Sequence, residues 1–255
     1  MTSALERLLL PAECLTCRRL LPDAHADDLV CTVCRSRMRP VRPPWCARCG
    51  QPEPHFGPCR LCRQWPAALQ SVRSAVWLEG GARDSVHALK YGGLPRIARD
   101  LAAVMTRHMP KPDRAARLVP VPLGAGRERG RGYNQSLSLA RALGLEWRLP
   151  VLAQLLARTR DTSTQTALTP DARLANVAGA FAVRNADLGR RNVGGRPGSS
   201  PSDSAFRTPH SSIVLVDDVF TTGATLAEAA RALEAAGCTT ISAVTFGRAS
   251  IPDFS

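Results

Sequence analysis

Carboxylates and hydroxyls follow the apolar run Ile213 to Val216, in the order Asp217-Asp218-Val219-Phe220-Thr221-Thr222-Gly223-Ala224-Thr225. Backbone N–H groups at the start of a helix bind phosphate, threonine hydroxyls add donors, and Gly223 permits close approach of the backbone. The adjacent carboxylates accept hydrogen bonds from two neighbouring ribose hydroxyls. A 5-phosphoribosyl group presents both features, so the segment predicts a site for it. The alternative is that the aspartates only cap a helix and the threonines form a solvated turn.

Eight of the nine cysteines form four Cys-x-x-Cys pairs before residue 63: Cys14/Cys17, Cys31/Cys34, Cys46/Cys49 and Cys59/Cys62. Each pair can place two thiolates on one tight turn, and two pairs complete a tetrahedral zinc site, so we expect one or two structural zinc ions. Pairing in sequence order and interleaved pairing both satisfy the spacing, and His25 and His55 are alternative ligands. Redox chemistry would explain a single pair, but four pairs favour metal. Cys238 stands alone, and we expect it to be buried.

Three arginines alternate after the apolar run Leu118 to Val121, at Arg127, Arg129 and Arg131. We expect this segment to be a Gly/Arg-rich loop at the end of a strand. Planar guanidinium groups placed there suit the oxygens of a pyrophosphate. A solvated basic turn is the alternative.

An α/β sheet is the fold class that would position these residues. Strand-like runs alternate with helix-like ones, so parallel strands joined by right-handed crossovers are expected, with ligands at the carboxyl ends of the strands. The predicted strands are Ser71 to Leu78, Leu118 to Val121, Ile213 to Val216 and Thr239 to Phe246. The predicted helices are Arg83 to Tyr91, Arg96 to His108, Asn134 to Leu143 with Gly144 as its stop, one starting at Thr169-Pro170, and one from Leu226 that ends at Gly237.

Composition divides the chain into two domains. Residues 1–66 are rich in Cys, Pro and Arg with little periodicity, which is typical of a small module held by metal rather than by a core. Residues 67–255 form the α/β domain. Within it, residues 185–211 are rich in Gly, Ser and Pro, and we expect this insert to be disordered because it cannot bury apolar surface.

The formal charge of +13 favours polyanionic partners such as nucleic acid or phosphorylated metabolites. An arginine-rich composition imposed by GC-rich coding is the alternative, since Lys90 and Lys111 are the only lysines. No apolar stretch approaches the roughly 18 residues of a membrane span, and the first residues lack the apolar core of a signal peptide. We therefore expect a cytoplasmic protein, whose thiols stay reduced.

The segment Ile213 to Thr225 resembles, at every position, the 5-phosphoribosyl-1-pyrophosphate (PRPP) signature of type I phosphoribosyltransferases. Val119-Pro120-Val121-Pro122-Leu123, then Arg129-Gly130-Arg131-Gly132-Tyr133-Asn134-Gln135, resemble the ComF family of competence-associated phosphoribosyltransferase-like proteins. Tyr133 stands where that family usually has Phe. With the four cysteine pairs, the resemblance covers nearly the whole chain.

This resemblance implies a type I phosphoribosyltransferase fold joined to an N-terminal double zinc ribbon. It implies binding of PRPP or ribose 5-phosphate, with Mg²⁺, at Asp217, Asp218, Thr221, Thr222, Gly223, Ala224 and Thr225. The segment from Arg158 to Thr169, with Arg158 and Arg160, is similar to the flexible loop that closes over the ligand. The implied role is uptake or processing of transforming single-stranded DNA, with that DNA and a competence helicase-like ATPase as partners.

Two further functions stay open at this stage. One is a metabolic phosphoribosyltransferase acting on a small nitrogen nucleophile or base, and the other is a non-catalytic sensor of PRPP or a nucleotide. No catalytic residue is assigned, because His87 and His108 lie in predicted helices where packing or surface roles are usual. The acceptor, and whether pyrophosphate is displaced at all, are not predicted.

Overall fold

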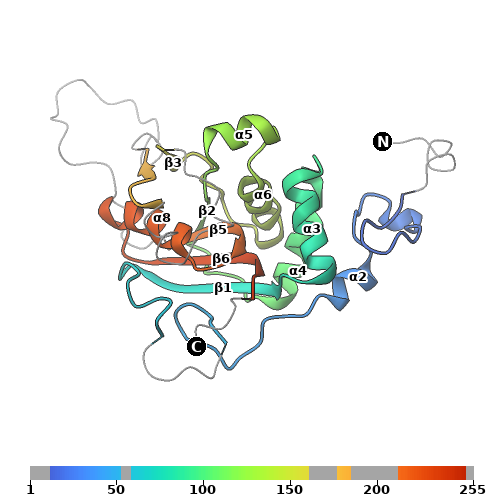
Figure 1. Cartoon of the computed structure of the whole chain (residues 1–255), viewed down its shortest axis with the longest axis horizontal. Helices are drawn as coiled ribbons and strands as arrows, with labels where there is room; N and C mark the ends of the chain where they lie inside the picture. The colour runs from blue at the N-terminus through green and yellow to red at the C-terminus, as the bar shows by residue number, and fades with distance from the viewer. Residues whose placement is uncertain (1–11, 53–58, 161–176, 185–211, 251–255) are drawn as a thin grey trace.

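A four-stranded parallel sheet in the order β1-β6-β5-β2 forms the centre of the structure, a computed structural model that describes residues 12–52, 59–160, 177–184 and 212–250 (Figure 1). The strands are β1 (Leu69–Trp77), β2 (Arg117–Pro120), β5 (Ile213–Phe220) and β6 (Ile241–Arg248). The predicted α/β fold class is confirmed, and each strand lies at a predicted position.

Helices cover both faces of this sheet (Figure 1). On one face lie α3 (Gly80–Tyr91), the short η2 (Pro95–Ile97) with α4 (Ala98–His108), and α6 (Gln135–Trp147). On the other face α8 (Ala224–Ala235) lies beside an antiparallel pair, β3 (Leu156–Arg158) and β4 (Phe181–Val183).

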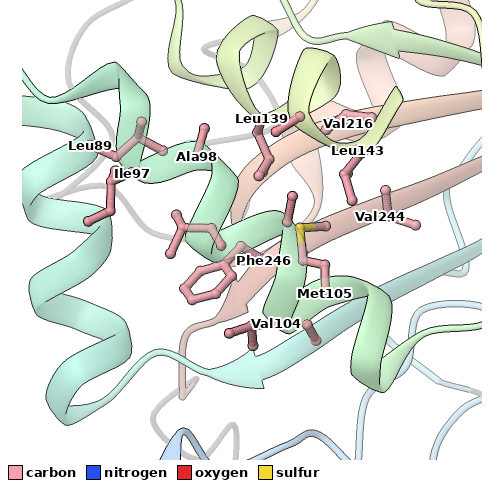
Figure 2. Packing of buried hydrophobic residues seen from close by; sticks show 14 of the residues in the cluster. Leu89, Ile97, Ala98, Val104, Met105, Leu139, Leu143, Val216, Val244 and Phe246 are labelled. Carbon is pink, nitrogen blue, oxygen red and sulfur yellow. The ribbon is translucent and has the colours of Figure 1, made fainter. Parts of the chain in front are cut away.

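The alternation of side chains along β5 explains its unbroken apolar run. Val214 and Val216 belong to the core under α3, α4 and α6, whereas Ile213 and Leu215 belong to the core under α8. Figure 2 shows the first of these cores, with Leu139 of α6 close to Val216. A strand buried on both faces has no polar side to present, which is the pattern of a parallel sheet.

Gly144 does not end α6, which continues to Trp147, so the predicted stop is wrong. A Cβ atom at Gly144 would lie 2.8 Å from Val151 Cγ2 and 3.0 Å from the Leu149 carbonyl oxygen. The chain doubles back onto the helix after Arg148, whose φ is 53°. The glycine therefore permits the close approach of the returning chain rather than breaking the helix.

The Cys-rich segment packs against the α/β domain and contains η1 (Asp23–His25) and α2 (Thr32–Arg37). Backbone from Arg39 to Val41 pairs with β1, since Trp77 N–H donates to Arg39 O at 2.9 Å and Val41 N–H to Ala75 O at 3.1 Å. This pairing covers the end of β1, one of the two edge strands of the sheet.

The two halves of the Cys-rich segment contribute to different cores. The first half buries Cys14, Leu29, Val30 and Met38 in the core under α3, α4 and α6, beside which α2 is seen in Figure 1. The second half buries Cys49, Cys62 and Trp65 in the core under α8. The segment thus has apolar packing as well as metal-binding cysteines, which its lack of periodicity did not predict.

Some predictions lie outside the described residues: the helix start at Thr169-Pro170 and the disordered insert 185–211. The domain boundary at residue 66 stays a prediction. Among the described residues, no helix has the length and apolar character needed to cross a membrane.

Candidate functional site

A cleft of about 810 Å³ lies at the carboxyl ends of β2 and β5, a size typical of small-molecule sites. It brings together predicted site residues from distant segments. Those that line it are Asp217, Asp218, Thr221, Thr225, Arg127, Arg131 and Arg158. Thr222, Gly223, Ala224, Arg129 and Arg160 do not line it.

The phosphate loop, residues Thr221 to Thr225, joins the end of β5 to the start of α8. Gly223 is the N-cap residue of this helix, with φ of 76°, and no side chain caps the helix there. The N–H groups of the first turn are therefore available to an anion, and the helix dipole favours one. Thr221 and Thr225 line the cleft, whereas Thr222 Oγ1 is buried behind it and has no hydrogen-bond partner in the described part of the chain.

Asp217, near the carboxyl end of β5, has one carboxylate oxygen without a hydrogen bond in the described part of the chain. Its Oδ1 accepts hydrogen bonds from Ser136 Oγ at 2.7 Å and from the Asp218 N–H at 2.9 Å. Among the described residues, its Oδ2 makes no hydrogen bond. Burial, reinforced by the neighbouring Asp218, raises the pKa of Asp217 to about 7.

Asp218 has a different environment, because Lys90 Nζ of α3 lies 2.6 Å from its Oδ2. Burial lowers the pKa of Lys90, but the Asp218 carboxylate outweighs this effect and raises that pKa above its ordinary value. Lys90 thus neutralises Asp218 within the cleft. Sequence reasoning assigned Lys90 no role in the site. The signal that could have found it is that Lys90 is one of only two lysines in an arginine-rich chain.

The segment from Asn134 to Ser136, at the start of α6, contacts these carboxylates. Asn134 Oδ1 caps α6 by accepting from the Ser136 N–H at 2.9 Å, and Asn134 Nδ2 donates to Val121 O at 3.0 Å. This cap fixes the first turn of α6. Ser136 then reaches Asp217, and Gln135 Nε2 lies 3.5 Å from Asp218 Oδ1.

The predicted Gly/Arg-rich loop is wrong, because residues Ala125–Arg131 form the helix α5. Residues four apart share one face of a helix, and residues two apart do not. Arg127 and Arg131 accordingly both line the cleft, while Arg129 is exposed outside it. Arg131 also donates to Gln135 Oε1 and lies over the Tyr91 ring at 5.4 Å.

The start of the predicted flexible loop is described, and it separates Arg158 from Arg160. Arg158 ends β3, lines the cleft and lies over the Phe181 ring at 5.2 Å. Arg160 is exposed, and its Nη2 donates to Ala178 O at 2.8 Å. Residues 161–169 of this loop lie outside the described residues.

The eight paired cysteines form two groups, Cys14/Cys17/Cys31/Cys34 and Cys46/Cys49/Cys59/Cys62, so the pairs combine in sequence order. The ligand atoms of each group lie within 4.8 Å of one another, with Sγ distances such as 3.9 Å for Cys17–Cys31 and 3.8 Å for Cys46–Cys62. Four zinc–sulfur bonds of about 2.3 Å in a tetrahedron separate the sulfurs by roughly 3.8 Å, so both groups fit zinc.

The cysteine geometry is consistent with two structural zinc ions. His25 pairs with Asp28 at 3.1 Å instead of joining the first group, and His55 lies outside the described residues. Cys238 is buried, as predicted.

Comparisons with known proteins agree with this arrangement. The family model of the double zinc ribbon domain matches residues 5–63, and that of the phosphoribosyl transferase domain matches residues 152–251. The DNA utilization protein YhgH of Salmonella typhi is 32% identical over 248 residues, which are 92% of this chain and 96% of the relative. The chain belongs to the ComF/YhgH family. The predicted family membership is thereby confirmed.

More distant ComF/YhgH relatives carry competence names. Competence protein ComFC of Bacillus subtilis is 27% identical over 220 residues, 81% of this chain and 78% of the relative. Competence protein F of Haemophilus influenzae is 28% identical over 233 residues, 88% of this chain and 91% of the relative.

Proposed function

We propose that this chain binds PRPP, or ribose 5-phosphate, which is PRPP without its pyrophosphate, in the cleft. We also propose that it serves the uptake or processing of transforming single-stranded DNA in the cytoplasm. The observation that carries the first part is the meeting of the phosphate loop, Asp217 and three guanidinium groups in one cleft. Each group matches one part of PRPP. The match to the phosphoribosyl transferase family supports the same ligand.

The ligand would lie with its 5-phosphate at the start of α8, where uncapped N–H groups and the hydroxyls of Thr221 and Thr225 donate to it. Ribose hydroxyls would donate to Asp217 Oδ2. Arg127, Arg131 and Arg158 would then face the pyrophosphate, where planar guanidinium groups bind oxygens in pairs.

Magnesium fits this cleft because PRPP itself offers oxygen ligands and Asp217 supplies negative charge beside them. When bound, the ion would neutralise the pyrophosphate and favour its departure. Lys90 leaves Asp217 as the carboxylate whose charge is not already paired, since its ammonium is bound to Asp218.

The proposed DNA role is supported by the names of the relatives, a DNA utilization protein and two competence proteins. The formal charge of +13 suits binding to DNA phosphates. A helicase-like ATPase of the competence machinery is the protein partner that we propose on the same ground.

A phosphoribosyl transfer reaction is the second candidate function. It is favoured by the match of residues 152–251 to the phosphoribosyl transferase domain. An attacking nitrogen would form a bond to the anomeric carbon as pyrophosphate leaves. Release of pyrophosphate in the presence of ammonia or a free nucleobase tests it, whereas ligand binding without release supports a sensor.

Calorimetry with PRPP and with ribose 5-phosphate, in the presence of Mg²⁺, tests the proposed ligand. We expect Asp217→Asn to weaken both affinities by about tenfold or more, because a charged acceptor of the ribose hydroxyls is lost. Arg129→Ala is the matched control, since Arg129 carries the same charge outside the cleft. Equal affinity of the Asp217 variant and the native chain would contradict the assignment.

Titration of single-stranded oligonucleotides with the full chain at several salt concentrations tests DNA binding. We expect an affinity that falls steeply with salt and varies little with sequence, because phosphates dominate the contact. No binding at low salt would remove the direct DNA role and leave the protein partner as the route.

A further inference from the structure

The side chain of Trp65, three residues after the last cysteine of the second group, packs directly against the phosphate loop. Its ring is buried and meets the Phe220 ring edge-on, with centroids 6.2 Å apart and planes at 65°. A Cβ atom at Gly223 would lie 2.4 Å from Trp65 Cζ2. The indole therefore occupies the space that any other residue at position 223 would fill.

Arg48 fixes the backbone that carries Trp65. Arg48 lies between Cys46 and Cys49, and its guanidinium donates to the carbonyl oxygens of Cys62 at 3.1 Å, Trp65 at 3.1 Å and Pro66 at 2.6 Å. The Trp65 N–H donates to Cys62 O at 3.2 Å. The position of the indole is thus set by the folded form of the second cysteine group.

Phe220, the residue immediately before the phosphate loop, has a second neighbour besides Trp65. The guanidinium of Arg248, at the end of β6, lies 4.3 Å from the centroid of the Phe220 ring. Arg248 Nη1 donates to Cys49 O at 3.0 Å, and its Nη2 donates to Gln51 Oε1 at 2.7 Å. The two side chains next to the Phe220 ring, Trp65 and Arg248, are therefore both held by the second cysteine group.

The first cysteine group has different neighbours. The Leu29 N–H donates to Asp100 Oδ2 of α4 at 2.9 Å, and Arg35 Nη1 lies 2.6 Å from Asp100 Oδ1. The buried cysteines of the first group, Cys14 and Cys34, belong to the core on the face of the sheet opposite α8. In the described segments, no hydrogen bond of the first group reaches the phosphate loop.

From these contacts we propose that the second cysteine group supports the ligand site from behind the phosphate loop, with Trp65 as the positioning residue of that loop, whereas the first group supports the α3 and α4 side of the fold. With metal bound, the second group holds Trp65 against Gly223 and keeps the loop in its phosphate-binding form. This inference rests on the proposed function in one respect, that the loop binds a phosphate ester. Preorganised groups bind better because less ordering is needed on binding.

Single substitutions in the full-length chain, purified in the presence of zinc, distinguish the roles of the two cysteine groups. We expect Cys59→Ser and Trp65→Ala to weaken ribose 5-phosphate binding by about tenfold or more, and Trp65→Phe to recover most of it because a ring edge remains. Cys17→Ser, the matched control in the first group, should change affinity by less than about twofold. Metal analysis should show zinc loss in both cysteine variants and full zinc in Trp65→Ala.

A core variant on the far face controls for general destabilisation. Met105→Ala in α4 is expected to lower the thermal unfolding midpoint while keeping the native affinity, since Met105 is buried in the core on the face of the sheet opposite α8 and the loop. If Met105→Ala loses as much affinity as Trp65→Ala at a similar loss of stability, the positioning role is overturned. Cys17→Ser and Cys59→Ser with equal affinities would overturn it as well.

Hydrogen exchange of the loop amides, residues 222–225, gives a readout without ligand. We expect faster exchange in Trp65→Ala and Cys59→Ser but native exchange in Cys17→Ser. A native chain that binds no ribose 5-phosphate but shows this asymmetry would refute the proposed ligand and leave the positioning role intact. A native chain that binds, with unchanged loop exchange in Trp65→Ala, would refute the positioning role alone.

Discussion

Replacing Asp218 by asparagine would leave the Lys90 ammonium in the cleft without its charged partner. The Asp218 side chain is 4% exposed and that of Lys90 is 24% exposed. Breaking a fully buried ion pair costs roughly 3–5 kcal/mol, and because water reaches Lys90 we expect a smaller loss of unfolding free energy, about 2–3 kcal/mol, for Asp218→Asn.

The reverse change, Lys90→Met, should cost at least as much, about 3 kcal/mol, because the Asp218 carboxylate that it leaves without a partner is the more buried of the two groups. The double variant should then be more stable than the sum of the two changes predicts, by about 1 kcal/mol or more, because neither charge is left alone. Thermal unfolding of the zinc-loaded protein measures this, at about 2–4 °C per kcal/mol for a chain of this size. Strict additivity of the two changes would refute the ion pair as an energetic unit.

Three further outcomes follow from the geometry of the cleft. Gly223→Ala should destabilise the chain by about 1–2 kcal/mol or more and weaken ribose 5-phosphate binding, because φ is positive at Gly223 and the new Cβ atom would collide with Trp65. An unfolding measurement that shows native stability would contradict this prediction. Arg127→Ala should weaken PRPP binding by about tenfold, while Arg129→Ala on the same helix should change the affinity by less than about twofold. Equal effects of the two substitutions in calorimetry would show that Arg127 does not face the pyrophosphate. When the pH drops from about 8 to about 6, the ligand affinity of the native chain should fall by about tenfold more than that of Asp217→Asn. The reason is that a carboxyl with a pKa of about 7 changes from mostly ionised to mostly protonated in that window. Parallel pH profiles of the two proteins would contradict the role of the ionised form.

The parts of the site that could be predicted from sequence are those encoded by adjacent residues. The strand, turn and helix from Ile213 to Thr225 lie in one stretch, so the unbroken apolar run of the strand and the position of Gly223 were enough to place a turn at the carboxyl end of the strand, followed by a helix. The cysteine pairs were equally local. Which pairs share a metal depends on the path of the chain between them, and the structure was needed to establish the sequential order.

Other features depend on segments that are distant in the sequence. The run from Ala125 to Arg131 has glycines that favour a loop by propensity, yet it forms α5, and only the helix shows that Arg129 differs from Arg127. The Lys90–Asp218 pair joins α3 to β5, which no spacing rule connects. Gly144 was misread because a glycine that ends a helix and one that admits a neighbouring chain have the same local signature.

A crystal structure of the native chain with PRPP and Mg²⁺ would test the central claim most directly. We expect the 5-phosphate within hydrogen-bonding distance of the backbone N–H groups of residues 223–225 and of the Thr221 or Thr225 hydroxyl, with the ribose hydroxyls on Asp217 and the pyrophosphate facing Arg127 and Arg131. A phosphate bound elsewhere on the chain, or ribose hydroxyls turned away from Asp217, would contradict it.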